Sequence, residues 1–166
     1  MKFSEMPYKR IDMEEVEKEY KSIIERTKNA KSGEEQFEIH REYYKFTADV
    51  QTSMELAMIR HDIDTTDEFY EKESDFYDEV GPIISQYENE YGKVLYDSPY
   101  RDYLESKIGK VTFKNIEIAN KAFDEKIIPL MQEENALSSR YSKLIATAKI
   151  PFEGEVYNRS EEHTSE

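Results

Sequence analysis

The sequence IRHDIDTTDEFY, residues 59–70, separates two long stretches in which apolar residues recur at helical spacing. Arg60 and His61 suit the C-terminal end of a helix, where the helix dipole is negative. Thr65 is a good N-cap for a following helix, with Glu68 three residues later as its capping-box partner. The stretch therefore predicts a tight junction at which one helix ends and the next begins.

Two long helices are expected on either side of this junction. Apolar side chains that step by three or four residues predict the first helix from Gly33 to His61 and the second from Thr66 to Tyr96. At about 1.5 Å per residue, the first helix would be about 40 Å long. Antiparallel packing of the two would form a long helical hairpin. The apolar face of the first helix contains Ile39, Tyr43, Phe46, Val50, Met54, Ala57 and His61.

The second of these helical patterns contains Pro82. A proline there removes one backbone hydrogen bond and clashes with the preceding turn. The apolar residues stay in phase across it, which favours one kinked helix over two separate helices. These residues are Phe69, Phe76, Val80, Ile83, Ile84, Tyr87, Tyr91 and Val94.

Shorter helices are expected around the hairpin. Asp12 is predicted to cap the first of them. Ser98 is predicted to cap a short helix that begins with Pro99 and ends at Gly109. Asp124 is predicted to cap the last helix. The apolar residues of that last helix are Ile127, Leu130, Leu137, Tyr141, Leu144, Ile145 and Ala148.

The pattern changes after Ala148. The segment Ile150–Tyr157 reads as two short strands around Gly154, and Pro151 restricts the first of them to a sheet edge. The predicted fold is therefore all-α: long antiparallel amphipathic helices in a hairpin or bundle, with a short β-hairpin at the C-terminal end.

The composition suggests a helical unit with a small core of its own. Only 37% of the 166 residues are hydrophobic, below the 45–50% usual for globular domains, while 36% are charged. The 13 tyrosines and eight phenylalanines make the chain too aromatic for a disordered segment. A fragment whose helices pack on missing partners would have this composition.

Charge and cysteine content exclude several functions. A net charge of −14 repels phosphate backbones, so no nucleic-acid partner is expected. The absence of cysteine excludes a disulfide framework and a thiolate zinc site. No window approaches the roughly 18 apolar residues of a membrane span, so we expect no membrane partner and a cytoplasmic location.

The histidines are the first candidates for catalysis or metal binding. His61 lies beside carboxylates, as a base oriented by an acid would, but it also falls on the apolar face of its helix, and the structural interpretation is preferred. A zinc-binding H-E-x-x-H helix needs a second histidine four residues after the first, and a ferritin-like di-iron site needs a glutamate three residues before each histidine. For His40 and His61, these positions hold Tyr44 and Thr65 in the first case and Phe37 and Met58 in the second. Neither motif is present.

Three further groups each allow a functional and a structural interpretation. A polar group interrupts the last apolar stripe and would form either a cleft wall or interdomain contact, or a solvent-facing side of the helix: Glu133, Glu134 and Asn135. A row of tyrosines would either bind peptide or pack helices together: Tyr87, Tyr91, Tyr96, Tyr100 and Tyr103. A group of carboxylates would either bind a cation or cap helices: Asp62, Asp64, Asp67 and Glu68. In each case the structural interpretation is preferred.

Three segments together resemble one known family. They are MKFSEMPYKR at residues 1–10, IRHDIDTTDEFYEKESDFYDE at residues 59–79, and QEENALSSRYSKLIATAKIPFEGEVYN at residues 132–158. In sequence, order and spacing they resemble the N-terminal region of oligoendopeptidase F-type zinc metallopeptidases, relatives of thimet oligopeptidase.

This resemblance implies the N-terminal part of a zinc-dependent enzyme that hydrolyses oligopeptides, in which the helices form part of the wall around a deep cleft. The family's H-E-x-x-H motif is absent here, so no catalytic or metal-binding residue is assigned, and the substrate-binding residues are unknown. The chain alone is expected to bind no zinc and to be inactive without its missing C-terminal catalytic domain. The alternative is a free-standing acidic helical module that binds other proteins and has no enzymatic activity.

The last eight residues, RSEEHTSE at 159–166, contain no apolar side chain and resemble the translation of a sequencing-library adapter. We therefore expect residues 1–158 to be a truncated helical region of an oligopeptidase and residues 159–166 to be a non-native tail. On this interpretation His163 has no function.

Overall fold

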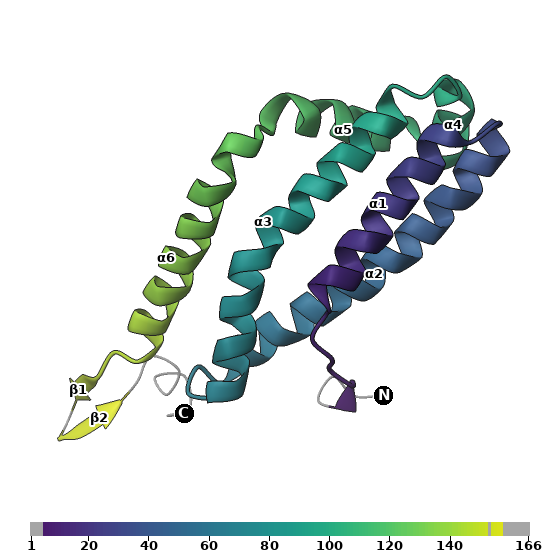
Figure 1. The fold of residues 1–166 in the computed structure, drawn as a ribbon. Helices are drawn as coiled ribbons and strands as arrows, with labels where there is room; N and C mark the ends of the chain where they lie inside the picture. The colour runs from purple at the N-terminus through teal and green to yellow at the C-terminus, as the bar shows by residue number, and fades with distance from the viewer. Residues whose placement is uncertain (1–4, 153, 158–166) are drawn as a thin grey trace.

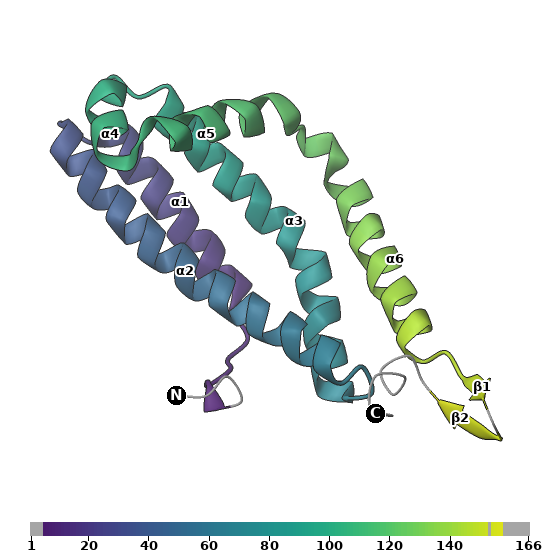
Figure 2. The ribbon, with the colours of Figure 1, turned by 180° about the vertical axis from the view of Figure 1, so that it is seen from behind.

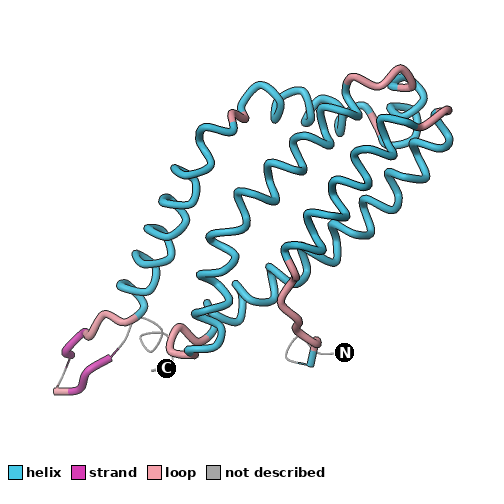
Figure 3. The backbone as a smooth tube through the Cα atoms, in the orientation of Figure 1, coloured by secondary structure: helices cyan, strands magenta, loops and turns pink. Residues whose placement is uncertain are grey.

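The computed structural model describes residues 5–152 and 154–157, and nearly all of this part of the chain is helical (Figure 3). The all-α prediction is confirmed. Two three-residue strands at the C-terminal end pair antiparallel, with Ile150 opposite Tyr157. The elements are α1 (Met13–Asn29), α2 (Gly33–Ile63), α3 (Glu68–Tyr96), α4 (Arg101–Ile108), α5 (Lys110–Ala122), the 3₁₀ helix η2 (Glu125–Ile127), α6 (Ile128–Ala146), β1 (Ile150–Phe152) and β2 (Glu155–Tyr157).

Helices α1, α2 and α3 lie side by side and form the body of an elongated bundle (Figure 1). Helices α4 and α5 gather at the end opposite the α2–α3 junction, as the view from behind shows (Figure 2). Helix α6 then runs back along α3 and contacts it. Within the described residues, none of the helices combines the length and the apolar character that a membrane span requires.

The junction between α2 and α3 is capped differently from the prediction. Asp67, and not Thr65, caps α3, because its carboxylate accepts hydrogen bonds from the backbone N–H groups of the second and third helical residues. The Asp64 carboxylate turns the chain just before, accepting hydrogen bonds from both the backbone and the hydroxyl of Thr66. Helix α3 therefore begins at Glu68, and the predicted capping box is wrong.

The prediction for Ser98 is also wrong, since α4 begins only at Arg101. The Ser98 hydroxyl accepts a hydrogen bond from the Tyr100 backbone and donates one of 2.5 Å to Gln36 on α2. Ser98 and Gln36 are both buried, so this bond satisfies two polar groups that would otherwise be costly to bury. Gly109 ends α4 as predicted, with a φ of +103° that favours glycine.

Of the two remaining predicted caps, that of Asp12 is confirmed and that of Asp124 is wrong, because the N-cap of the last helix is Ile127. Asp12 caps α1 as expected, accepting hydrogen bonds from the backbone N–H groups of Glu14 and Glu15. The Asp124 carboxylate accepts a hydrogen bond from the Lys126 backbone and so starts the short η2 turn. Helix α6 follows with Ile127 as its N-cap and without a side-chain hydrogen bond at this cap.

The core consists of two apolar clusters along the bundle. The predicted apolar face of α2 supplies residues to both, including Ile39, Val50 and Ala57. Phe69 was predicted to face the core but is 54% exposed, because it lies in the first turn of α3 at the open end of the bundle. One cluster contains the buried residues Val16, Tyr20, Val50, Ala57, Tyr77, Val80 and Ile84. The other, towards α4 and α5, contains Ile23, Ile24, Ile39, Tyr91, Leu95, Leu104 and Phe113.

A buried carboxylate ties the segment before α1 to α3. Glu73 is 4% exposed and accepts two hydrogen bonds from the Arg10 guanidinium, at 2.6 and 2.8 Å. The Tyr8 hydroxyl donates a third hydrogen bond to the same carboxylate. The bonds from Arg10, followed by the one from Tyr8, lower the pKa of Glu73 although burial opposes this shift.

Candidate functional site

Helix α3 continues as one helix through Pro82, and this has a consequence for α6. Because proline has no N–H group, the carbonyl oxygen of Asp78 four residues earlier loses its helical partner. The Asn135 side-chain amide donates a hydrogen bond to this oxygen at 3.3 Å. The Gln132 amide donates another to the neighbouring carbonyl of Glu79 at 2.8 Å. Part of the polar group predicted on α6 therefore closes the interruption in α3.

Further polar contacts extend this connection along α6. The Ser139 hydroxyl donates a hydrogen bond of 2.5 Å to the Asp78 carboxylate, and Lys143 forms an ion pair with Glu71. Together with the contacts at the proline, they form a polar seam between α6 and α3. Helix α6 is thus tied to α3 by hydrogen bonds and an ion pair, and its Ile128, Met131 and Ile145 side chains are half-buried.

Four large apolar side chains of α6 point away from this seam, although the sequence pattern predicts a stripe that faces the core. No α6 residue is buried, and Leu144 is 71% exposed. Glu133 and Glu134 are also exposed and, with Leu130 and Leu137, line a hollow of about 400 Å³. We name the following set the α6 apolar face: Leu130, Leu137, Tyr141 and Leu144.

His61 lies where the structural interpretation placed it. It is 6% exposed on α2, and its Nδ1 lies 3.9 Å from the Asp62 carboxylate, too far for a hydrogen bond that would orient a base. The nearby carboxylates of Asp64 and Asp67 are engaged in the turn and the cap of the junction. Within residues 5–152 and 154–157, no group of three or more His, Asp or Glu side chains could hold a metal ion. The described residues therefore do not fit a zinc site.

His40 is packed among aromatic rings. Its ring stacks on those of Tyr43 and Tyr91, and its Nδ1 lies 3.0 Å from the Tyr91 hydroxyl. Burial lowers the pKa of His40 because desolvation disfavours the charged form. A neutral, stacked imidazole in this setting supports packing rather than catalysis.

The predicted row of tyrosines also packs helices together. Tyr91 is 2% exposed and stacks on Tyr43 across the α2–α3 contact with ring centroids 3.7 Å apart. The Arg101 guanidinium lies over the Tyr96 ring, with its Cζ atom 4.0 Å from the ring centroid. Tyr103 is placed so close to Gly33 that a Cβ added there would lie 2.7 Å from its ring. These three tyrosine rings therefore contact other helices or Arg101 with surfaces that a bound peptide would otherwise contact.

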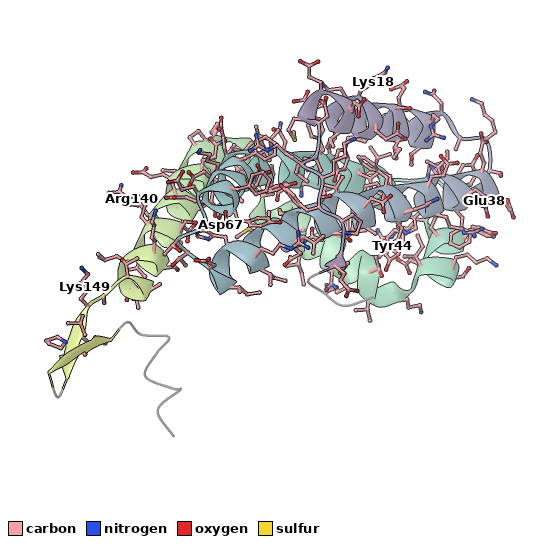
Figure 4. All side chains as sticks on the ribbon, turned by 90° about the horizontal axis from the view of Figure 1, so that it is seen from below. Lys18, Glu38, Tyr44, Asp67, Arg140 and Lys149 are labelled. Carbon is pink, nitrogen blue, oxygen red and sulfur yellow. The ribbon has the colours of Figure 1, made fainter. Side chains whose placement is uncertain are left out.

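Two neighbouring hollows share a carboxylate that the sequence reasoning missed. Glu88 on α3 lines a hollow of about 520 Å³ over α2 and another of about 430 Å³ towards α5. Tyr44, labelled in Figure 4, lies on the exposed side of α2 and lines the first. The signal that could have revealed Glu88 is a charged residue directly after Tyr87, within the apolar stripe of α3.

These observations define an elongated helical domain with three hollows, one of them beside the uncovered α6 apolar face, and no metal-binding group among its described residues. Residues 3–123 match the family described as the peptidase M3 N-terminal domain. The chain therefore belongs to the peptidase M3 family through its N-terminal domain. No curated protein matches it.

Solved structures agree with this assignment. The chain is 41% identical to the protein titled PZ peptidase A with inhibitor 2, with a TM-score of 0.92 over 95% of this chain. It is 39% identical to a putative oligoendopeptidase F, with a TM-score of 0.92 over 95% of this chain. It is 38% identical to a putative oligoendopeptidase F from Bacillus anthracis str. Ames, with a TM-score of 0.91 over 95% of this chain.

The chain spans 28% of the first two of these proteins and 29% of the third. The resemblance found in the sequence is thus confirmed. These similarities do not favour the alternative of a free-standing interaction module.

Proposed function

We propose that this chain is the N-terminal helical part of a zinc-dependent oligoendopeptidase that hydrolyses short peptides. The observation that carries the proposal is the combination of a match to the peptidase M3 N-terminal domain with a span of only 28–29% of related solved proteins. Zinc would be held by residues outside this chain, because the described residues offer no fitting group. The chain by itself then binds no zinc and cleaves no peptide.

The proposal includes a partner for the α6 apolar face: the C-terminal catalytic part of the same enzyme. Two observations support this. The polar side of α6 is already used against α3, and the apolar side is exposed to an extent unusual for leucine in a core-forming helix. An amphipathic helix oriented in this way stabilises the assembly only when its apolar face is covered by another surface.

The division of the chain also belongs to the proposal. Residues 1–158 would be the truncated native region, whereas residues 159–166 would be a non-native tail. The tail and His163 lie outside the residues that the structure describes. The proposal also keeps the cytoplasmic location that the sequence predicts.

The gene and the longer protein provide the first test. Clean genomic sequence should continue in frame beyond the codon for Asn158 and reach an H-E-x-x-H motif. The longer protein should cleave a quenched fluorescent oligopeptide and lose this activity to a chelator, whereas this chain should show no cleavage. A stop codon directly after the codon for Glu166, or zinc-dependent cleavage by this chain alone, would contradict the proposal.

A matched pair of variants tests the partner of α6. Leu144→Ser should leave the melting temperature of this chain unchanged but lower that of the longer protein, because the side chain would be buried only there. Val111→Ser on α5 is the control, since Val111 is 74% exposed and Leu144 is 71% exposed. If both variants left the longer protein equally stable, α6 would not be covered by the catalytic part.

A further inference from the structure

The α6 apolar face has the residue spacing of a coiled-coil seam. Leu130, Leu137 and Leu144 lie seven residues apart, and Tyr141 falls four residues after Leu137. A seven-residue repeat keeps apolar side chains in line with a second helix that runs alongside, because helices that supercoil have 3.5 residues per turn. The opposite side of α6 is already hydrogen-bonded to α3. The α6 apolar face is therefore patterned to receive another helix.

A hollow within this face offers the space that such packing requires. Its volume is about 400 Å³, and its lining includes Leu130, Glu134, Leu137 and Tyr141. In knobs-into-holes packing, a side chain of one helix inserts between four residues of the facing helix. The three apolar residues of this lining are each more than half exposed, so the described part of the chain leaves the hollow open.

Two oppositely charged residues lie on one flank of the α6 apolar face. Glu133 and Arg140 are exposed and, like the leucines, lie seven residues apart. Arg140 is labelled on α6 in Figure 4. Neither side chain forms an ion pair or a hydrogen bond with another described residue. Both charges are therefore available to a second molecule that docks on this face.

We infer that two copies of this chain associate through their α6 helices in antiparallel orientation. In antiparallel helices, the residues of one flank meet the same flank of the partner in reverse order. Glu133 then lies opposite Arg140 of the second copy, and the two-fold symmetry of the dimer forms this pair twice. A parallel pair would place Ser138 and Ile145 opposite these charges and leave both without a partner.

The apolar residues are complementary in the same antiparallel register. Leu137 of the second copy comes to the hollow at Glu134, and Leu130 packs against Tyr141 of the second copy. The stripe covers only about two heptads and is interrupted by Glu134, so we expect a weak dimer with a dissociation constant on the order of 100 μM. Each copy carries a net charge of −14, and a salt concentration of about 0.15 M screens the resulting long-range repulsion.

This inference concerns the chain by itself and does not rest on the proposed peptidase function. In the longer protein, the catalytic part would cover the α6 apolar face in place of the second copy. At about 1 μM, far below the expected dissociation constant, the chain is monomeric. Melting comparisons that concern the single chain, such as that of Leu144→Ser, are therefore made at this concentration.

The first experiment is analytical ultracentrifugation of the chain from about 5 to 500 μM in 0.15 M salt, where a reversible dimer is expected. Leu137→Asp should weaken the dimer by about 100-fold or more, because both copies bury this leucine at the interface. Val111→Asp on α5 is the control and should have no effect, since Val111 is also exposed but lies on another helix. Circular dichroism checks that both variants keep their helix content. A chain that stays monomeric up to 500 μM would overturn the proposal and leave the catalytic part as the occupant of this face.

A charge exchange then tests the antiparallel register. Glu133→Arg and Arg140→Glu should each weaken self-association by about fivefold to tenfold, because each change turns two attractive pairs into two repulsive ones. Glu133→Arg should do so even though it makes the chain less negative overall. An equimolar mixture of the two variants should associate about as tightly as the native chain, since every flank charge meets an opposite one. Tighter self-association of Glu133→Arg, or no recovery in the mixture, would overturn the proposal.

Discussion

Truncation of two leucines to alanine would test whether this chain buries α4 and leaves α6 uncovered. Leu104 on α4 is 0% exposed and belongs to the cluster with Leu95 and Phe113, whereas Leu137 on α6 is 54% exposed. Leu104→Ala removes buried methyl groups and leaves a cavity, which costs about 2–5 kcal/mol. Leu137→Ala removes groups that already contact solvent, so its effect should stay within about 0.5 kcal/mol.

The assay is urea unfolding followed by circular dichroism at one low protein concentration. In a thermal scan of the same variants, a loss of about 3 kcal/mol would appear as a fall in melting temperature of roughly 6–12 °C for a chain of this length. The identical chemical change in the two variants makes each the control for the other. A loss above about 2 kcal/mol for Leu137→Ala would refute the reasoning, because the α6 apolar face would then be covered in this chain.

Three further changes test individual contacts by the same unfolding measurement. Asn135→Leu should cost about 1–2 kcal/mol, because it leaves the carbonyl freed by the proline of α3 without a donor; no loss would show that this bond is not formed. Gly33→Ala should cost about 1–3 kcal/mol despite the better helix propensity of alanine, since the new Cβ would lie 2.7 Å from Tyr103; a stabilised variant would contradict this packing. Glu73→Gln should cost about 1–3 kcal/mol at pH 7 through the loss of the Arg10 bonds. The pKa of Glu73 is lowered in the folded chain, so the native carboxylate stabilises the fold above its ordinary pKa and loses this contribution as the pH falls through the lowered value. The difference between the Glu73→Gln variant and the native chain should therefore shrink towards acid pH; a difference independent of pH would contradict the assignment.

Local sequence signals predicted much of the bundle. Helical spacing gave the extent of α2 to within two residues and identified the side of α2 that faces the core, because a buried stripe leaves a period that can be read directly. The cap of α1 was predicted correctly from Asp12, since capping depends on neighbours within three residues. The caps of α3 and α4 were not, because several residues in each turn can accept such hydrogen bonds and tertiary contacts select among them. Ser98, for example, donates to Gln36, which is distant in sequence.

The candidate site was less predictable than the fold. The spacing around His40 and His61 correctly excluded an H-E-x-x-H helix in this chain, since such a motif is local. Glu88 was not predicted, because the role of a polar residue within an apolar stripe depends on which residues the neighbouring helices place around it. The two hollows that Glu88 lines are formed with residues of α2 and of α5, whose positions no local pattern specifies.

The sequence by itself determined that the chain is helical, where its long helices lie, which side of α2 is buried and which family it resembles. Each of these follows from residues close together in the chain or from directly comparable segments. Only the tertiary structure decided that α6 turns its polar side towards α3 and its apolar side outward. Periodicity shows which side chains share a face of a helix but does not show what that face meets. Here the carbonyl freed by Pro82 gives the polar side of α6 a partner on α3, and the leucines remain exposed.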